Sequence, residues 1–429
     1  MQKFNFTSTA TTCSITGIKN KTVAQIVVPN YVTGISAGAF SGCSSLESIT
    51  LPFIGGSKSA TISSASTLFG YIFGTSSYTG GVSTWQTYAF SDATYYIPSS
   101  LKSVTVTGGE ILYGAFYNCT SLESITIPDS VTSIGECAFF YCRSLKSITI
   151  PDSVTSIGSS AFECCYKLVE VINKSNLNIT AGSSSYGYVG YYAKEVHKGK
   201  SKIVNVNDYL FYTYNGVNYL IGYAGNDTAL TLPDNYNGKE YEIYKYAFYN
   251  CTTLESITIP DSVTSIGNSA FYGCTSLESI TLPFIGATNG GTTNTHFGYI
   301  FGASSYSDNS SYVPSSLKTV VITGDTSIAS SAFFDCTSLE SITIPDSVTS
   351  IGDSAFYSCD SLASVTIGNG VKSIGSDAFS FCYSLASIKY RGTESRWEAI
   401  SKGSAWNYNT GNYTITYELV VFDSPFVYL

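Results

Sequence analysis

Charged residues are scarce in this chain, making up 12% of its 429 residues against 44% apolar residues. The formal net charge is −9, with 21 Lys and Arg residues against 30 Asp and Glu residues. Nucleic acids are bound through clustered basic side chains, so we expect no nucleic-acid partner. No apolar run approaches the roughly 18 residues that a membrane-spanning helix needs, so we expect no membrane insertion. The first residues contain no apolar segment of the signal-peptide type, which keeps a cytoplasmic location open.

Residues that carry metal or enzyme chemistry are also few. The chain has two histidines, His197 and His296, and neither has the spacing of a metal ligand. Both stand in irregular inserts, where we expect a solvated imidazole. There is no Cys-x-x-Cys pair and no phosphate-binding loop ending in Gly-Lys-Ser/Thr. Asp129, Asp152, Asp261 and Asp346 each follow a proline, where a turn explains them. The sequence therefore predicts no enzyme, no metal site and no cofactor.

What the chain does have is a repeat of 23 residues. One copy opens at Leu122 with Leu-Glu-Ser-Ile-Thr-Ile-Pro-Asp-Ser-Val-Thr-Ser-Ile-Gly and closes on Ala-Phe and Cys142. Further copies open at Leu145, Leu168, Leu254, Leu277, Leu339, Leu362 and Leu385. A fixed period of this size is typical of a solenoid. Because solenoids usually work by presenting a long surface, the repeat favours binding over catalysis.

Each repeat is interpreted as one coil of an α/β solenoid. Residues 123–127 alternate polar and apolar side chains, which predicts a half-buried strand. Pro128 ends this strand, and residues 131–134 form a second short extended piece. Residues 136–142 are long enough for one helical turn on the back of the coil. Stacking then places Leu on Leu, Ile on Ile and Phe on Phe, and burying each large side chain is worth about 1.5–3 kcal/mol before the entropy cost.

The residue after the opening leucine alternates in charge along the first half: Glu47, Lys102, Glu123 and Lys146. Opposite charges on neighbouring strands are slightly stabilising. The alternation requires the coil at Leu101 to stack directly on the coil at Leu46, with the residues between them looped out. Glu255 and Glu278 are expected to be like-charged neighbours. A Ca²⁺ ion between them is the less favoured alternative, since hard cations want six or more oxygens.

Three breaks interrupt the period. Two inserts share the text Phe-Gly-Tyr-Ile-Phe-Gly, at Phe69–Gly74 and Phe297–Gly302. The third break contains two strands joined by Asn215-Gly216, a strong hairpin signal, and we interpret it as an elaboration that splits the array without ending it. The expected organisation is an N-terminal cap and degenerate repeat at 1–45, a repeat block at 46–172 with an insert at 53–96, the hairpin region at 173–244, a second block at 245–390 with an insert at 284–313, and a C-terminal cap at 391–429.

Nine of the twelve cysteines share one repeat position, three residues before an opening leucine: Cys43, Cys119, Cys142, Cys165, Cys251, Cys274, Cys336, Cys359 and Cys382. A position that recurs in this way predicts a buried cysteine ladder, where Cys behaves as a small hydrophobe. We favour free core thiols, which fit a reducing environment. Stacked Cα atoms about 5 Å apart also meet the limits for a disulfide, so cross-linked neighbours remain an alternative.

The repeat text Ser-Ile-Thr-Ile-Pro-Asp-Ser-Val-Thr-Ser-Ile-Gly-x-x-Ala-Phe-x-x-Cys closely resembles the BspA-like (Treponema pallidum type) leucine-rich repeat family. The resemblance covers most of the chain, and it also includes the two Phe-Gly-Tyr-Ile-Phe-Gly inserts and the segment Tyr390–Trp397. It implies a right-handed, curved leucine-rich solenoid, usually on a cell surface or secreted. Family members are linked to adhesion through host matrix proteins or other microbes, and the resemblance supplies no catalytic residues.

Two surfaces are candidate binding sites. The concave strand face presents short polar side chains: Glu123, Thr126, Lys146, Thr149, Glu255, Thr258, Glu278 and Thr281. The inserts hold the aromatic residues that this face lacks: Tyr71, Phe73, Tyr299 and Phe301. The more favoured interpretation of these rings is that they fill small cores of the inserts, and the alternative is a paired contact site for protein or glycan.

The sequence therefore predicts a non-enzymatic surface or secreted adhesin that binds a matrix or cell-surface protein. An intracellular protein-interaction scaffold is the alternative, and a carbohydrate-binding module is the weaker one.

Overall fold

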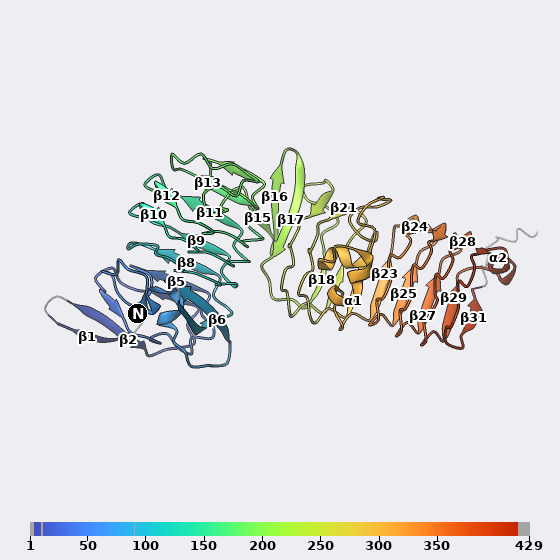
Figure 1. The fold of residues 1–429 in the computed structure, drawn as a ribbon, viewed down its shortest axis with the longest axis horizontal. Helices are drawn as coiled ribbons and strands as arrows, with labels where there is room; N and C mark the ends of the chain where they lie inside the picture. The colour runs from blue at the N-terminus through green and yellow to red at the C-terminus, as the bar shows by residue number, and fades with distance from the viewer. Residues whose placement is uncertain (1–3, 10–11, 90, 419–429) are drawn as a thin grey trace, which may run out of the picture. The chain divides into compact units, whose positions relative to one another are not determined.

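The chain folds into two compact units, Met1–Lys202 and Ile203–Leu429, in a computed structural model that describes residues 4–9, 12–89 and 91–418. Each unit has its own hydrophobic core, one built from residues between Ile15 and Ala193 and the other from residues between Phe211 and Ile400. The region expected as one hairpin elaboration, 173–244, is divided between the units. Both units are β-solenoids with coils of about 23 residues, as the repeat predicts (Figure 1).

The opening strand of each coil pairs in parallel with the strand of the next coil, and we call the result the front sheet. In unit 1 it consists of β3 (Gln25–Val27), β5 (Ser48–Leu51), β8 (Ser103–Val106), β9 (Ser124–Thr126), β11 (Ser147–Ile150), β13 (Glu170–Asn173) and β14 (Glu195–His197), in two hydrogen-bonded groups that divide between β9 and β11. In unit 2 it is one sheet of eight strands: β18 (Ala229–Thr231), β20 (Ser256–Thr258), β22 (Ser279–Leu282), β23 (Thr319–Ile322), β25 (Ser341–Ile344), β27 (Ser364–Ile367), β29 (Ser387–Tyr390) and β31 (Thr414–Tyr417).

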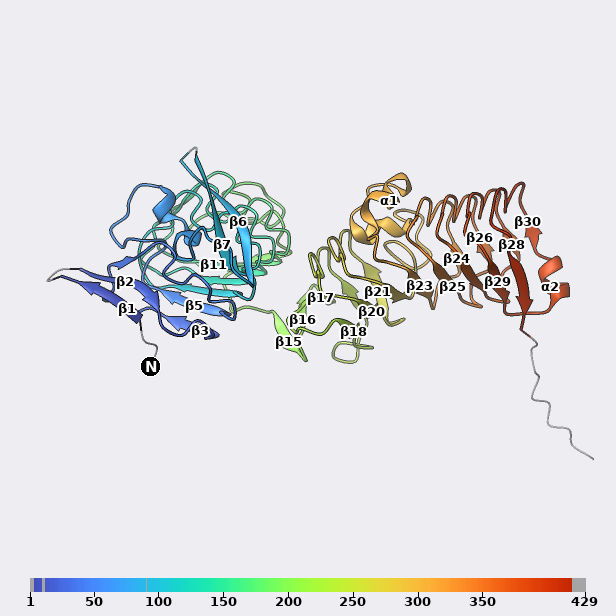
Figure 2. The same cartoon turned by 90° about the horizontal axis from the view of Figure 1, so that it is seen from below.

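Shorter strands form a second layer across the core. In unit 1 they are β4 (Gly34–Ile35), which pairs with the N-terminal hairpin of β1 (Phe4–Ser8) and β2 (Cys13–Ile18), and then β10 (Ser133–Ile134) and β12 (Ser156–Ile157). In unit 2 they are β19 (Tyr241–Ile243), β21 (Val263–Ile266), β24 (Ser327–Ile328), β26 (Ser350–Ile351), β28 (Ser373–Ile374) and β30 (Ser401–Lys402). Figure 2 shows the second-layer strands β26 and β28 and the front strands β25, β27 and β29 as two rows of the same stack.

The expected helical turn after the second strand is replaced by irregular turns. In the coil at Leu122, Cys137 and Tyr141 have φ angles of 54° and 61°, in the left-handed region that a right-handed helix does not use. The N–H of Phe139 donates to the carbonyl of Ala161 in the next coil at 2.7 Å. The helix prediction is wrong because alternate N–H groups, those of Cys137, Phe139 and Tyr141, find their acceptors in the next coil rather than along their own segment.

Phenylalanine and cysteine ladders run through the core as predicted. Phe116 and Phe139 stack with ring centroids 5.3 Å apart and an interplanar angle of 5°, and Phe333 and Phe356 stack at 5.1 Å. Eight of the nine ladder cysteines are buried and Cys251 is half-buried. Five of these thiols donate to a phenylalanine carbonyl of the preceding coil at 3.1–3.2 Å: Cys142, Cys165, Cys274, Cys359 and Cys382.

Both inserts are looped out of the stack. Ser48 pairs with Ser103 across β5 and β8, which confirms that the coil at Leu46 stacks directly on the coil at Leu101. Ser279 pairs with Thr319 in the same way in unit 2. The first insert holds two 3₁₀ turns, η1 (Ala65–Thr67) and η2 (Phe69–Ile72), and a hairpin of β6 (Gly81–Tyr88) and β7 (Ser91–Pro98). The second holds η3 (Phe297–Phe301), η4 (Tyr306–Asp308) and the helix α1 (Asn309–Tyr312).

Unit 2 begins and ends with irregular elements. Its first strands are β15 (Val204–Val206), β16 (Tyr209–Tyr214) and β17 (Val217–Tyr223), and the turn at Asn215-Gly216 confirms the predicted hairpin. At the other end, α2 (Glu394–Glu398) buries Trp397, and the ring of Trp406 packs edge-on against Phe379 at 6.1 Å. These rings close the phenylalanine ladder. Residues 419–429 of the expected C-terminal cap lie outside the described residues.

Candidate functional site

In unit 1 the front sheet places two of its predicted binding residues in an ion-pair chain. Glu123 pairs with Lys146 and lies 3.6 Å from Lys102, which confirms the charge order expected along neighbouring coils. Lys146 is only 7% exposed. Its ammonium group therefore holds neighbouring coils together and is not accessible to a partner. Of the other predicted residues in this unit, Thr126 is exposed and Thr149 is half-buried.

The charge chain also sets the ionisation of Glu123. Burial by itself would raise the pKa of this carboxyl, but the ammonium group of Lys146, and behind it Lys102 and Lys167, outweigh burial and lower the pKa. Glu123 consequently remains a carboxylate at neutral pH.

In unit 2 the front sheet is more open. Ser256 pairs with Ser279, so Glu255 and Glu278 are neighbours, as the sequence predicts, and both side chains are exposed. Thr258 is exposed and Thr281 half-buried, and they are in register on adjacent strands. This face thus presents hydroxyl and carboxylate groups to solvent.

A groove lies at the carboxyl ends of β18, β20 and β22, with a volume of about 460 Å³. This volume is within the range of small-molecule and side-chain sites. Its lining is Thr231, Leu232, Asp234, Thr258, Ile259, Pro260, Asp261, Ser262, Thr281 and Thr323. It therefore includes two of the predicted binding residues, Thr258 and Thr281, and brings them together with Asp261, which the sequence assigned to a turn, and with Asp234.

The coil that contains Leu230, beside the groove, is longer than a consensus coil. Its extra residues form a tight turn in which the N–H of Tyr236 donates to the carbonyl of Lys239 at 2.9 Å, with Asn237 and Gly238 at positive φ. Tyr236 stacks on Phe211 with ring centroids 4.1 Å apart, which fixes the turn on the core. The strand register shifts after Tyr241, where β19 pairs with β21 of the next coil.

Asp261 is positioned from two coils away. The hydroxyl of Thr323 donates to its Oδ1 at 2.6 Å. This contact is available because the intervening coil replaces the consensus Pro-Asp with Pro283-Phe284, and Phe284 is buried in the core. Unit 1 repeats the arrangement with an amide, since the hydroxyl of Thr107 donates to Oδ1 of Asn30 at 2.9 Å.

The inserts extend the phenylalanine ladder through the coils that lack Ala-Phe. Phe69 and Phe73 lie between Phe40 and Phe116, with successive ring centroids 4.9–6.4 Å apart, and the N–H of Phe69 donates to the carbonyl of Ala115 as a consensus phenylalanine does. In unit 2 the equivalent rings are Phe297 and Phe301, between Phe271 and Phe333.

Phe73 and Phe301 are fully buried in these ladders, so neither ring offers a surface to a partner. The two rings fill a core, which was the favoured interpretation of the insert aromatics. Tyr71 and Tyr299 are half-buried and keep part of their surface in solvent. Burial raises the pKa of Tyr299.

A buried amide fastens each insert, although the two amides come from different elements. In unit 1, Gln86 of β6 accepts from the N–H of Gly70 and donates to the carbonyl of Tyr117, both at 2.8 Å. In unit 2, Asn309 of α1 accepts from the N–H of Gly298 at 3.0 Å and donates to the carbonyl of Phe334 at 2.9 Å. The shared Phe-Gly-Tyr-Ile-Phe-Gly segment therefore has a structural role, since it fills the core and is held there by a buried amide.

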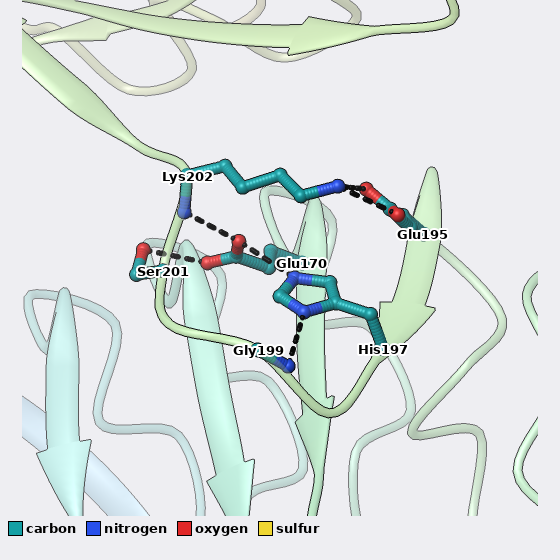
Figure 3. Close-up of polar contacts among 6 residues, drawn as sticks. All are labelled: Glu170, Glu195, His197, Gly199, Ser201 and Lys202. Carbon is teal, nitrogen blue, oxygen red and sulfur yellow. Dashed lines mark hydrogen bonds and ion pairs between the residues drawn. The ribbon is translucent and has the colours of Figure 1, made fainter.

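A polar cluster lies at the end of unit 1, around the fully buried carboxylate of Glu170 on β13 (Figure 3). This carboxylate accepts hydrogen bonds from Nε2 of His197 at 3.0 Å, from the hydroxyl of Ser201 at 2.6 Å and from the N–H of Lys202 at 2.7 Å. The N–H of Gly199 donates to Nδ1 of His197 at 3.0 Å, which assigns the ring proton to Nε2. The cluster thus anchors the last residues of unit 1 to its front sheet.

Solvated histidines were expected, and that expectation is wrong for both. The side chain of His197 is 13% exposed, and His296 is 8% exposed with Nε2 3.2 Å from the carbonyl oxygen of Ala303. His197 lies on β14 of the front sheet beside Glu170, and His296 lies in an insert that folds onto the solenoid, so both rings lose most of their contact with solvent. One signal for the cluster was present in the sequence, since Glu170 replaces the serine of the consensus Ser-Ile-Thr.

Among the residues whose structure is described, no three His, Cys, Asp or Glu side chains are grouped as metal ligands. The same residues include no helix with the length and apolarity needed to cross a bilayer.

The parallel front sheets and the stacked leucine, phenylalanine and cysteine ladders define a leucine-rich repeat β-solenoid. The model of the BspA type leucine rich repeat region matches residues 17–107, 109–221, 237–289 and 306–423, in six copies. The chain belongs to this family.

Solved structures of bacterial leucine-rich repeat proteins are also similar to the chain. A leucine rich cell surface protein from Faecalibacterium prausnitzii A2-165 is 25% identical over 94% of this chain and 97% of that one, with a TM-score of 0.30. A leucine-rich repeat protein from Bacteroides ovatus ATCC 8483 is 24% identical over 97% and 98%, with a TM-score of 0.33. The T. pallidum leucine-rich repeat protein is 24% identical over 49% and 85%, with a TM-score of 0.25. No curated protein matches the chain.

Proposed function

We propose that this protein is a surface or secreted adhesin that binds a protein of the host matrix or of another cell through strands β20 and β22 of the front sheet of unit 2. Membership of the BspA type family supports a binding role and implies adhesion. The observation that carries the proposal is the exposed row of hydroxyl and carboxylate side chains that ends at the 460 Å³ groove. In unit 1 the corresponding charges are paired with one another.

The predicted binding residues contribute to this proposal in different ways. Glu255, Thr258, Glu278 and Thr281 form the contact surface in unit 2. Thr126 and Thr149 continue a similar surface in unit 1, where Glu123 and Lys146 hold adjacent coils together. The half-buried Tyr71 and Tyr299 are secondary contacts at the edge of each insert.

Surface plasmon resonance of the intact chain over immobilised fibronectin, laminin and collagen tests the proposal. Binding to one of them is expected, and Thr258→Arg combined with Thr281→Arg should weaken it about tenfold, because two bulky cations then occupy the face. The matched control is Thr343→Arg with Thr366→Arg, at the same register position on β25 and β27. Equal loss in both double variants, or no binding to any matrix protein, would argue against the proposed surface.

A further inference from the structure

The groove of unit 2 carries negative charge that the protein itself does not balance. Asp234 and Asp261 are exposed on its wall, and its lining contains no Lys, Arg or His. In the part of the chain that the structure describes, neither aspartate forms an ion pair, and Asp261 accepts one hydrogen bond, at Oδ1 from Thr323. The two carboxylates belong to adjacent coils in register, since Thr231 pairs with Thr258. A cationic group is therefore the complementary ligand.

The rest of the lining favours a long side chain over a bare ion. Leu232, Ile259 and Pro260 give the groove an apolar part, and threonine hydroxyls stand beside it. Arg and Lys side chains bury their methylene stems on apolar surface while the charged head binds polar groups. A calcium ion prefers six to eight oxygen ligands, several of them carboxylate or carbonyl, and would leave the apolar part unused.

A second observation points to a missing ligand in the same groove. The hydroxyl oxygen of Ser262 is buried and has no hydrogen-bond partner. The equivalent serines Ser153 and Ser347 donate to a carbonyl of the preceding coil at 2.7 Å. Ser262 has no such acceptor, although the strand register of its coil shifts close by, and a buried unpaired hydroxyl is destabilising. An occupant of the groove with polar hydrogens or lone pairs would offer the missing partner.

We propose that this groove binds one arginine side chain presented by the protein partner, with its guanidinium group between Asp234 and Asp261 and its methylenes against Leu232 and Ile259. Arginine is favoured over lysine because its planar fork can donate to two carboxylates at once, with strong charge-assisted hydrogen bonds. The inference rests on the proposed protein-binding function and names the partner group that this face recognises.

The direct test uses a probe with the side chain alone. Nα-acetyl-arginine-N-methylamide is titrated into the intact chain labelled at threonine and isoleucine methyl groups. Methyl NMR shifts are expected at Thr231, Thr258, Thr281 and Ile259, with millimolar affinity that weakens as salt is added. The uncharged citrulline analogue should bind at least about tenfold more weakly, since it loses the charge-assisted bonds. Equal binding of the two probes, or arginine-induced shifts elsewhere only, overturns the proposal.

Variants locate the charge. Asp234→Asn with Asp261→Asn should reduce arginine affinity about tenfold or more. Asp129→Asn with Asp152→Asn, at the same repeat position on adjacent coils of unit 1, should leave it unchanged. A lysine probe that binds as tightly as arginine, or Ca²⁺ that shifts the same methyl groups at micromolar concentration, overturns the choice of arginine.

The outcome is separable from that of the proposed function. If a matrix protein binds the intact chain but the Asp234→Asn, Asp261→Asn variant binds it equally well, the arginine site is wrong while the adhesin function stands. If the arginine probe binds and no matrix protein does, the groove chemistry stands and the proposed partner class fails.

Discussion

At the scale of single residues, the buried polar groups take partners from other coils or from distant segments. The thiol of Cys382 donates to the carbonyl of Phe356, and Gln86 reaches Tyr117 across the insert. Glu170 is fully buried yet accepts three hydrogen bonds. Each such group can be buried only in the stacked structure, because a buried polar group without a partner lowers the stability of the fold by about 1–3 kcal/mol.

The buried thiols predict a loss of stability in alkali. Burial raises the pKa of Cys382 to about 12 and that of Cys43 to about 11. An unfolded thiol ionises near about 8.5, so the folded state keeps a proton that the unfolded state loses. The contribution is complete below that pH and declines as the pH rises towards the folded pKa, by about 1.4 kcal/mol per pH unit for each thiol.

Urea unfolding of the reduced protein between pH 8 and 11 measures this effect. Replacing Cys382→Ala should make the fall in unfolding free energy less steep, because one raised thiol pKa is removed. Identical slopes in the two proteins would show that Cys382 is not a protonated core thiol. Mass spectrometry of the unreduced, alkylated protein separately decides between free thiols and cross-linked neighbours.

At the scale of elements, the inserts supply the core phenylalanines that two coils lack at the usual position. The coils at Leu46 and Leu277 have Pro-Phe-Ile-Gly where the consensus has Pro-Asp-Ser-Val, and neither has an Ala-Phe pair at the consensus distance from that proline. The insert returns two phenylalanines to the ladder from a 3₁₀ turn, and a buried amide holds that turn in place. A hairpin supplies the amide in one unit and a short helix in the other.

The buried amide that holds each insert predicts local destabilisation when it is removed. Gln86→Ala should lower the unfolding free energy of unit 1 by about 1–3 kcal/mol, because the N–H of Gly70 and the carbonyl of Tyr117 lose their buried partner. Hydrogen exchange followed by mass spectrometry should show faster exchange in residues 65–120. Ser83→Ala, an exposed position on the same strand, is the control and should change little. Unchanged hydrogen exchange in Gln86→Ala would contradict the conclusion that Gln86 holds the insert on the core.

At the scale of the whole molecule, the two units have separate cores and separate front sheets. Unit 1 ends at the Glu170 cluster, and unit 2 begins at β15 with its own antiparallel strands. Each unit is large enough to bury a core independently. Unfolding of the chain should therefore depart from a single two-state transition.

Denaturant unfolding followed by hydrogen exchange tests this independence. We expect two transitions, and Glu170→Gln should lower the stability of unit 1 by about 1.5–3 kcal/mol while leaving unit 2 unchanged, because a neutral amide replaces a carboxylate with three donors. Glu195→Gln is the matched control on the neighbouring strand. It removes a solvent-accessible ion pair with Lys202 and should cost less than about 1 kcal/mol. One cooperative transition shifted by Glu170→Gln in both units would contradict the division.

The sequence by itself determined the period, the ladders and the order of stacking. Leucine, isoleucine, phenylalanine and cysteine recur at fixed positions, so each coil can bury its apolar edge only against the next copy. The alternating charges at Glu47, Lys102 and Glu123 were sufficient to place the coil at Leu46 on the coil at Leu101, across an insert of unknown form. The hairpin at Asn215-Gly216 followed from local turn chemistry alone.

The tertiary structure decided what depends on groups that meet from different coils. The back segments became turns because alternate N–H groups bond to the next coil. The two histidines lost most of their exposure through neighbours from other segments, Glu170 for His197 and Ala303 for His296. Thr258 and Thr281 could be predicted as surface residues, but not their meeting with Asp234 and Asp261. Several coils line that groove, so the side chains that meet in it depend on how those coils stack and not on the sequence of any one of them.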